Sequence, residues 1–556
     1  MSQSFDLQER YILDLPDEML LHIFSYLNIS SSRKHVSRVC RKFYELMCVV
    51  RRDSEFPLEL SYSKICDKKI RRSIVYSSRE FEELTIYYRH DQESINRKHE
   101  IKIEYIEDVM LNFGRRIKKF GLSNFELFES QLRKILDCIP NVEFLGLNKV
   151  KVNIEPNENI SELNLCKLKK LEIRNGSNCF NILNRLPKDT IREAIIMSHD
   201  VDIGLQKFFN KQTNIQMLEI DKNNQLKFDH LKLEYLKLNS KFINLPLNLR
   251  QQQKLRYIDF SNYLIDDEIL TTICKMTNLE VVKMCVNLGM PCYVFESLKY
   301  LTQLKELQLK SDEIHKCNHL LELSRMRLKI EKLTLLFEKE KIPPEFFIQL
   351  SQNFRKLKQI IISNRSIIII NTILEHFPNL ESIAVDFYSD EPEEILVISE
   401  NLKHEKLKEI IATSHCEEKN TNSLLTLLNA CPNLERIMLF NLAEDLQQII
   451  NNHPKLTELS LRFEDFTFFD EIKEKVHAIS TAAKRLKYVN LNGLSRCTEF
   501  LERGSSIEGL FTDVFEDEFD DIMFFVHISS ATEAETEIMM KKKRNSSELC
   551  CEELRS

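Results

Sequence analysis

Tryptophan is absent from this 556-residue sequence, and glycine is scarce, with 9 residues in the whole chain. So few glycines leave little material for the glycine-rich loops that cradle phosphate groups, and neither a Walker sequence nor a dinucleotide-binding fingerprint occurs. An HExxH zinc motif, a GxSxG nucleophile elbow and a paired CxxC spacing are also missing. We therefore expect a protein without catalytic activity, cofactor or bound metal.

Long apolar runs and a strong excess of one charge are missing too. The formal net charge of -7 gives no basic footprint of the kind that nucleic-acid binders carry. The longest aliphatic run, 367–370, is far shorter than the roughly 20 residues that cross a bilayer. The first ten residues are polar, so no secretory signal is expected, and the 15 scattered cysteines are interpreted as reduced thiols. We expect a cytoplasmic or nuclear protein, or one in both compartments, that binds neither nucleic acid nor membrane.

An internal repeat organises most of the chain. Its pattern is one apolar residue, two variable residues, an apolar residue, a variable residue and an apolar residue. The clearest copies lie at 139–147, 377–385, 431–439 and 453–461, and weaker ones lie at 213–220 and 277–284. The first apolar position of each copy, here called the anchor, falls at Phe81, Ile117, Val142, Leu168, Ile191, Ile215, Leu233, Leu255, Leu279, Leu304, Ile330, Leu357, Leu380, Leu407, Leu434, Leu456 and Leu486. The mean spacing of about 25 residues lies within the range of leucine-rich repeats.

Each repeat combines a short strand with a helix-like segment. The last two apolar positions alternate with polar ones, as in a strand with one buried face. Segments such as 266–274 have an acidic start that suits a helix N-terminus. Each unit leaves apolar surface that only the next unit can cover. The sequence therefore predicts an α/β fold in which a curved leucine-rich-repeat solenoid carries parallel strands on its concave face and helices outside.

The N-terminal segment has a different pattern. Pro16 suits a first helical turn, and Leu20, Ile23, Phe24 and Leu27 fall at helical spacing on one face. About 40 residues cannot bury so many large apolar groups alone, so apolar surface should remain for a partner. The alternative is that these helices only cap the first repeat.

Residues 10–50 resemble an F-box, which implies three helices that dock on the Skp adaptor and, through it, on a cullin scaffold. The matching positions, which the resemblance implies to be adaptor-binding, are Leu15, Pro16, Ile23, Phe24, Leu27, Val39, Cys40 and Phe43. Two features depart from the family: Ser32-Arg33 replaces the usual Asp-Leu pair with one extra loop residue, and Phe43 replaces the usual tryptophan.

The later repeats resemble those of F-box/leucine-rich-repeat proteins over roughly residues 80 to 495. The asparagine or cysteine that this family places three residues after the strand is mostly missing. Asparagines sit one position early instead, at Asn124, Asn175, Asn262, Asn364 and Asn441.

The predicted domains follow from these boundaries. We expect an F-box at 10–50, a helix-and-strand connector at 51–80, about 17 irregular repeats at 81–500, a C-terminal cap at 501–528 and a disordered tail at 529–556. The acidic and aromatic segment 511–525 is interpreted as the cap, with a binding strip as the alternative. Lys541–Arg544 fits a solvated charge run better than a nuclear import signal.

The resemblance implies a substrate-recognition subunit of an SCF-type ubiquitin ligase, which would bind target proteins for ubiquitin-dependent degradation. The alternative is a non-degradative repeat protein that acts as a binding scaffold or inhibitor. The protein substrate would contact variable strand positions on the concave face. These positions are Tyr235, Lys237, Tyr257, Asp259, Lys283, Glu306, Gln308, Lys310, Arg436, Met438, Phe440, Arg462 and Tyr488.

Overall fold

The structure, a computed structural model, describes most of the repeat region and little of the N-terminus. The described residues are 19–20, 43, 58–76, 81–88, 101–155, 161–197, 204–221, 226–240, 245–286, 295–311, 318–337, 342–364, 369–387, 398–399, 402–412, 421–440, 446–462, 488–492, 510–516 and 522–528. The chain divides into two compact units, Met1–Leu255 and Arg256–Ser556. Each unit is described by itself.

The first unit contains a parallel sheet in which each strand pairs with the strand of the next coil. In order of pairing, its strands are β1 (Leu58–Ser61), β2 (Glu83–Tyr87), β3 (Lys119–Ser123), β5 (Phe144–Asn148), β7 (Lys170–Arg174), β8 (Glu193–Met197), β9 (Met217–Asp221) and β10 (Tyr235–Leu238). Two short strands, β4 (Glu126–Phe128) and β6 (Lys151–Asn153), pair separately.

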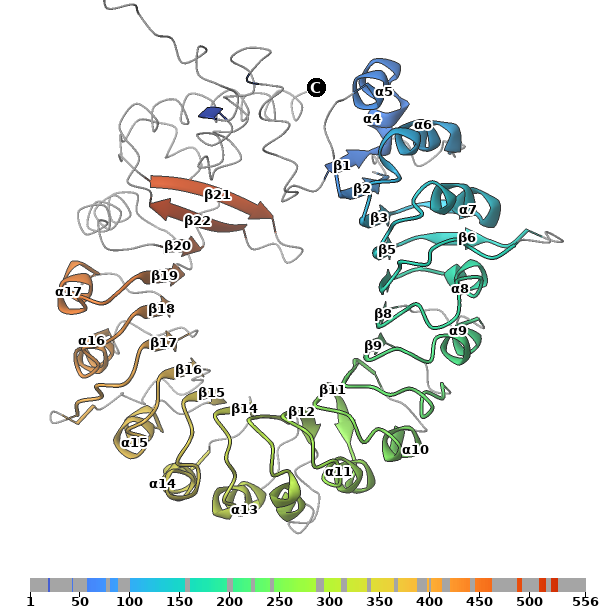
Figure 1. Ribbon diagram of the computed structural model, residues 1–556. Coiled ribbons are helices and arrows are strands. Elements are labelled where there is room, and N and C mark those ends of the chain that lie inside the picture. The colour runs from blue at the N-terminus through green and yellow to red at the C-terminus, as the bar shows by residue number, and fades with distance from the viewer. Residues whose placement is uncertain are drawn as a thin grey trace, which may run out of the picture. The chain divides into compact units, whose positions relative to one another are not determined.

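Helices lie in most of the described connections between these strands. They are α4 (Tyr62–Cys66), α5 (Lys68–Val75), α6 (Ile103–Phe113), α7 (Glu129–Asp137), α8 (Cys179–Leu183), α9 (Leu205–Lys211) and α10 (Leu245–Arg250). In Figure 1 the strands of this unit stand in a row, and α7 to α10 lie on the opposite side of their coils. A helix in the connection lets consecutive strands run parallel. The observed parallel strands and the helices between them confirm the predicted strand-and-helix coil.

The second unit repeats this arrangement. Its parallel strands are β11 (Tyr257–Ile265), β12 (Val281–Val286), β13 (Glu306–Lys310), β14 (Lys332–Leu336), β15 (Gln359–Asn364), β16 (Ser382–Phe387), β17 (Glu409–Ala412), β18 (Arg436–Phe440), β19 (Glu458–Arg462) and β20 (Tyr488–Asn492). Its helices are α11 (Asp267–Ile273), the 3-10 helix η4 (Ser297–Tyr300), α13 (Asn318–Arg325), α14 (Pro344–Asn353), α15 (Ile369–His376), α16 (Thr421–Asn429) and α17 (Leu446–Asn452).

Helix α11 begins where its acidic start predicts. The Asp266 side chain accepts a hydrogen bond from the backbone N–H of Ile269, and Asp267 and Glu268 occupy the first turn. The cap satisfies a backbone donor that lacks a partner within the helix, and the acidic residues stabilise the positive end of the helix dipole.

Among the described residues, no helix is long and apolar enough to cross a membrane.

The predicted anchors form the core of the coils. Every anchor from Ile117 to Leu456 is buried, including Ile117 and Ile191, which match the repeat least well. Phe81 is half-buried, and its ring packs edge-on against Phe113, with centroids 5.5 Å apart. Leu486 lies outside the described residues. Burying one such side chain contributes roughly 1.5–3 kcal/mol, so the stack of anchors stabilises each unit substantially.

The position directly after the strand is left-handed in three successive coils. Asn124, Lys149 and Asn175 have φ angles of 63°, 50° and 50°. Asparagine tolerates this conformation well, whereas lysine adopts it less often. The N–H of Asn124 donates to the carbonyl of Asn148 at 2.8 Å, and that of Lys149 to Arg174 at 2.7 Å. The early asparagines of the first coils therefore extend the ladder between strands by one backbone bond; Asn441 lies outside the described residues.

The described part of the 51–80 connector packs onto the first coils. Strand β1 pairs with β2, and the Tyr62 hydroxyl accepts a 2.7 Å hydrogen bond from the N–H of Lys102. The Arg71 guanidinium lies 3.9 Å from the ring centroid of Tyr105 and 3.3 Å from the Asp108 carboxylate. These contacts fix β1, α4 and α5 against α6.

The last parallel strand of the second unit is covered by an antiparallel hairpin. Strands β21 (Leu510–Glu516) and β22 (Ile522–Ile528) pair with each other, and β22 pairs with β20. The pairing occupies backbone groups that an open sheet edge would leave exposed. These strands lie within the segment that the sequence predicts to be a cap.

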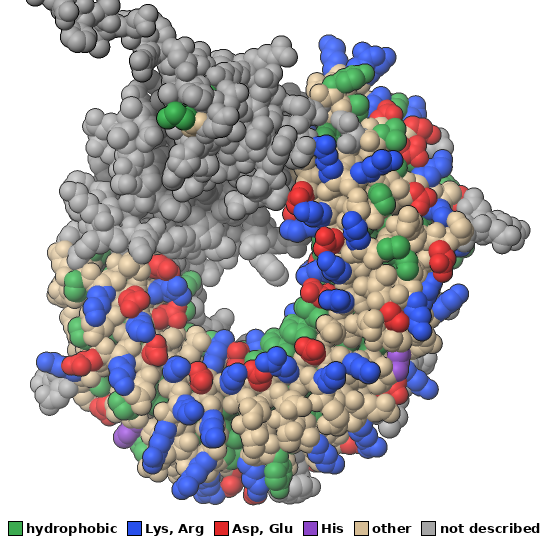
Figure 2. Space-filling model, viewed as in Figure 1, with side chains coloured by type: hydrophobic (Ala, Val, Ile, Leu, Met, Phe, Trp, Pro, Cys, Tyr) green, Lys and Arg blue, Asp and Glu red, His purple; other side chains and the backbone are tan. Residues whose placement is uncertain are grey.

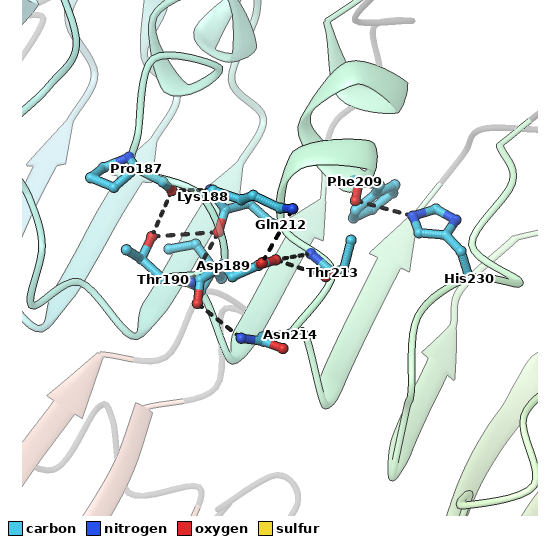
Figure 3. A network of polar contacts seen from close by, with 10 residues as sticks. Pro187, Lys188, Asp189, Thr190, Phe209, Gln212, Thr213, Asn214 and His230 are labelled. Carbon is cyan, nitrogen blue, oxygen red and sulfur yellow. Dashed lines mark hydrogen bonds and ion pairs between the residues drawn. The ribbon is translucent and has the colours of Figure 1, made fainter.

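Buried polar side chains join neighbouring coils by forming hydrogen bonds with backbone groups, which the apolar anchors cannot do. Gln212 is fully buried, and its side-chain oxygen accepts the N–H of the preceding anchor, Ile191, at 3.1 Å. Its amide group donates to the carbonyl of Pro187 at 2.6 Å, and Asp189 accepts the N–H of Thr213 at 2.8 Å (Figure 3). Buried backbone groups need a hydrogen-bond partner, and Gln212 supplies one from the next coil. We call such a buried side chain, which bonds to the backbone of the preceding coil, a clasp.

Buried polar residues occupy the same position, three residues before the anchor, in later coils. Gln252, three residues before the anchor Leu255, accepts the N–H of Leu233 at 3.0 Å. In the second unit, His404 and His453 also precede their anchors by three residues. The His404 ring contacts the carbonyl of Phe377 at 2.9 Å, in the preceding coil. Polar residues at this buried position therefore replace the apolar residues that other coils carry there.

Replacing Gln212 with alanine tests the clasp. The change leaves the buried Ile191 N–H without its partner, which costs about 1–3 kcal/mol, whereas the Pro187 carbonyl keeps a 3.3 Å hydrogen bond from the Thr190 hydroxyl. We expect the Gln212→Ala variant to unfold at lower urea concentration and the Ile191 amide to exchange hydrogen faster. Lys207→Ala, at an exposed site in α9, is the matched control. Equal exchange at Ile191 in both variants would contradict the assignment.

Candidate protein-binding face

Side chains at alternate strand positions point away from the core and form what we call the strand face. The structure places Tyr235 and Lys237 on β10 of the first unit. All other predicted substrate-binding residues lie in the second unit, on β11, β12, β13, β18, β19 and β20. Asp259 is buried, and its carboxylate accepts hydrogen bonds from the N–H and hydroxyl of Ser261. Asp259 is therefore less available to a partner than its neighbours.

A lysine-rich triad lies on β12 to β14. The Glu306 carboxylate is 3.5 Å from the Lys283 ammonium and 3.2 Å from the Lys332 ammonium. Both lysines are about a quarter to a third exposed. One carboxylate between two ammonium groups leaves one positive charge in excess. We call Lys283, Glu306 and Lys332 the cationic triad.

A second triad, on β17 to β19, has the opposite balance. The Arg436 guanidinium donates to Glu409 at 2.8 Å and lies 2.6 Å from Glu458. Hydrogen bonds that Arg436 donates to Glu458 and to Glu409 raise the pKa of its guanidinium, so this side chain stays charged. Two carboxylates around one guanidinium leave one negative charge in excess. We call Glu409, Arg436 and Glu458 the anionic triad.

Alongside the anionic triad, and extending from it toward the cationic triad, the strand face is apolar. Ile361, Ala384, Ile411 and Met438 occupy the same register position on β15, β16, β17 and β18. All four are half-buried, while the residues beside them in the strands, such as Ile360 and Ile362, belong to the core. Sequence reasoning named only Met438 of these four. The continuous run Ile360–Ile362 was the available signal, because a strand with one polar face should alternate.

Over two runs of consecutive coils, charged residues alternate in sign at the position directly after the anchor; Arg192 and Gln216 interrupt the alternation between the two runs. In the first unit this charge ladder is Glu82, Lys118, Glu143 and Lys169. In the second unit it is Arg256, Glu280, Lys305, Glu331, Lys358, Glu381, Lys408 and Glu435. Neighbouring members pair, for example Lys118 with Glu82 at 2.6 Å and Lys408 with Glu381 at 2.8 Å. Figure 2 shows positive and negative side chains interspersed over both units.

The ion pairs of the charge ladder lower the pKa values of their glutamate members. Hydrogen bonds from Lys305 and Arg256 lower the pKa of Glu280, and hydrogen bonds from single lysines lower the pKa of Glu143, Glu331 and Glu381. Residues at the same position of adjacent parallel strands lie about 5 Å apart, so opposite charges attract and like charges would repel. The alternation therefore favours the observed register of the sheet and leaves little unpaired charge along it.

Few of the predicted adaptor-binding residues lie in the described part of the chain. Phe43 is helical and only 6% exposed, and Leu20 is helical and fully buried. The neighbouring Met19 is 52% exposed, although sequence reasoning did not select it. Leu15, Pro16, Ile23, Phe24, Leu27, Val39 and Cys40 lie outside the described residues. Phe43 therefore contributes to the interior, and Met19 offers apolar surface.

A cleft of about 370 Å³ lies in the first unit and has mixed charge. Arg115, Arg116 and Lys167 contribute positive charge to it, and the paired residues Glu82 and Lys118 form another part of its lining. Within the described ranges, no group of three or more His, Cys, Asp or Glu residues is arranged to hold a metal ion.

Comparison with known proteins identifies the N-terminal segment. Residues 12–49 match the F-box-like family, so this segment is an F-box-like domain. No curated protein sequence matches the chain significantly.

Solved structures with similar repeats share little sequence with this chain. A leucine-rich-repeat protein of Leptospira interrogans is 14% identical, covering 72% of this chain and 99% of that one, with a TM-score of 0.28. A chain of the TLR13–ssRNA13 complex is 13% identical, covering 68% and 61%, with a TM-score of 0.30. A chain of the yeast Rad7–Elc1 complex is 12% identical, covering 71% and 92%, with a TM-score of 0.31. At TM-scores near 0.3, nothing about the function of this chain rests on these likenesses.

Glu280 tests the charge ladder because it pairs with two cations. Its folded-state pKa is lowered, so its contribution to stability is present above the unfolded pKa of about 4.3 and is lost as pH falls through the lower folded value. We expect Glu280→Gln to unfold at lower urea concentration than wild type at pH 7 and at nearly the same concentration near pH 3. The exposed Glu234→Gln is the control. A difference that persists unchanged at low pH would contradict this role.

Proposed function

We propose that this chain, which joins an F-box-like domain to leucine-rich-repeat coils and is thus an F-box/leucine-rich-repeat protein, is the substrate-recognition subunit of an SCF-type ubiquitin ligase. The observation that carries the proposal is the F-box-like domain at residues 12–49, because such a domain implies an Skp-type adaptor as partner. A cullin scaffold would follow through the adaptor. The chain itself would perform no catalytic step.

The F-box-like domain would supply the adaptor contact. Leu15, Pro16 and Ile23 match the adaptor-binding positions of the family, and the exposed Met19 lies between them in the sequence. An exposed large apolar side chain loses contact with water when a partner covers it, which favours association. Phe43 would act indirectly, because its burial holds the shape of the domain and leaves little of its ring for a partner.

The repeats would supply the contact with the target protein. The strand face combines charged triads with an apolar centre, and protein interfaces often have an apolar core with a polar rim. Holding a target beside the conjugating enzyme raises its effective concentration to the order of millimolar. A firm connection between receptor and adaptor would keep that concentration high. The packing of the connector through Tyr62 and Arg71 supports such a connection.

Degradation and location belong to the same proposal. We propose that bound targets are ubiquitinated for proteasomal degradation in the cytoplasm, the nucleus or both, where reduced cysteines are stable.

Co-purification with an Skp-type adaptor tests the proposal. The full chain, co-expressed with the adaptor, is expected to form a stoichiometric complex. Leu15→Ala/Pro16→Ala and, separately, Met19→Glu are expected to abolish or strongly weaken it, because both disturb the apolar docking surface. Leu111→Glu is the matched control, since Leu111 is an exposed apolar residue outside the F-box-like domain.

Two outcomes would count against the ligase function. The absence of a complex with any Skp-type adaptor would contradict adaptor docking. A complex that forms but supports no ubiquitination of any bound protein would favour the alternative, a non-degradative binding scaffold or inhibitor.

A further inference from the structure

The apolar row of the second unit, Ile361, Ala384, Ile411 and Met438, lies across adjacent strands and not along one strand. Consecutive parallel strands are about 4.8 Å apart, so the row extends for roughly 14 Å perpendicular to the strands. The same position on β12 and β13 carries Lys283 and Gln308, and that on β19 carries Ser460. The row is therefore an apolar strip that is bounded at its own register position by polar residues, Thr334 on β14 and Ser460 on β19.

An extended peptide is a poor occupant for this strip. Strands β15 to β18 are paired on both sides, so no sheet edge is available to accept a further strand. A peptide lying extended across the row would bring its own N–H and C=O groups against apolar side chains that cannot hydrogen-bond. Burying such groups without partners costs free energy. A helix avoids this cost, because its backbone groups bond to one another.

Charge at the two ends of the row favours one direction of the helix. The cationic triad (Lys283, Glu306, Lys332) lies beyond the β15 end, and the anionic triad (Glu409, Arg436, Glu458) lies beside the β18 end. A helix carries partial positive charge at its N-terminus and partial negative charge at its C-terminus. Its N-terminus therefore fits over the anionic triad and its C-terminus over the cationic triad.

We propose that the strand face of β14 to β19 binds an amphipathic helix of a partner protein, with the apolar side of the helix on the row and its N-terminus toward β19. From β14 to β19 is about 24 Å, the length of roughly 16 helical residues. Apolar residues at i, i+4, i+7 and i+11 would contact the row. Under the proposed function, on which this inference rests, the helix belongs to the target protein.

A synthetic peptide tests this site directly. The probe is a capped, fluorescein-labelled 16-residue peptide with leucine at i, i+4, i+7 and i+11 and alanine and glutamine elsewhere. Its isomer, with the same composition, has the leucines spread around the helix. In fluorescence anisotropy with the full chain, we expect the probe to bind at least about tenfold more tightly than the isomer. Equal binding, or binding of neither peptide, would overturn the proposal.

Variants locate the site. Ile411→Glu is expected to weaken probe binding by at least about tenfold, because it places a charge in the middle of the row. If that variant does not fold, Ala384→Asp replaces it, since alanine contributes little to the core. The control is Thr85→Glu, at the corresponding position of β2 in the first unit. Full probe binding by a folded row variant would overturn the assignment.

Crosslinking reports the direction of the helix. With a benzophenone at the N-terminus of the probe, crosslinks are expected in β18 or β19, and with one at the C-terminus, in β13 or β14. The reverse pattern would overturn the orientation. Adaptor co-purification is an independent readout of the same samples. Loss of probe binding with the adaptor retained therefore refutes the helix site alone, whereas loss of the adaptor with probe binding retained refutes the ligase role alone.

Discussion

Burial of each anchor between neighbouring coils is the interaction on which the rest of both units depends. A single strand-and-helix coil cannot cover its own apolar side, so it is stable only against a neighbour. Anchors such as Ile215 and Leu357 are almost completely buried, and the parallel ladder holds successive strands in register above them. Because the strands stay in register, residues far apart in the sequence come together in straight rows on the strand face. The charge ladder, the two triads and the apolar row all exist for this reason.

Polar groups are used inside these coils in two different ways. The buried side chains of Gln212 and Gln252 accept hydrogen bonds from the backbone N–H groups of the preceding anchors, Ile191 and Leu233. The charge ladder lies at the surface, where ion pairs contribute little net stability but penalise a shifted register. The first links successive coils in the interior, and the second links them at the surface.

The sequence predicts the anchors, the strands and helix α11 well, because apolar spacing and an acidic helix start act locally. The clasp at Gln212 was not predictable in the same way, since a polar residue at a buried position looks like a break in the pattern. The left-handed Lys149 was hidden because lysine rarely adopts that conformation, although its neighbours Asn124 and Asn175 gave a signal. The charge ladder was visible once the anchors were aligned, because its members follow them directly. The apolar row required the register of the sheet, and the adaptor-binding residues other than Phe43 lie outside the described residues.

The account assigns adaptor docking to the N-terminal domain and target recognition to the coils. Proximity labelling in cells, comparing the full chain with a chain lacking residues 12–49, separates these roles most directly. We predict that deletion removes labelling of the adaptor and cullin, while a set of other proteins stays labelled and becomes more abundant. Unchanged adaptor labelling after the deletion, or no labelled protein that accumulates, would contradict the assignment.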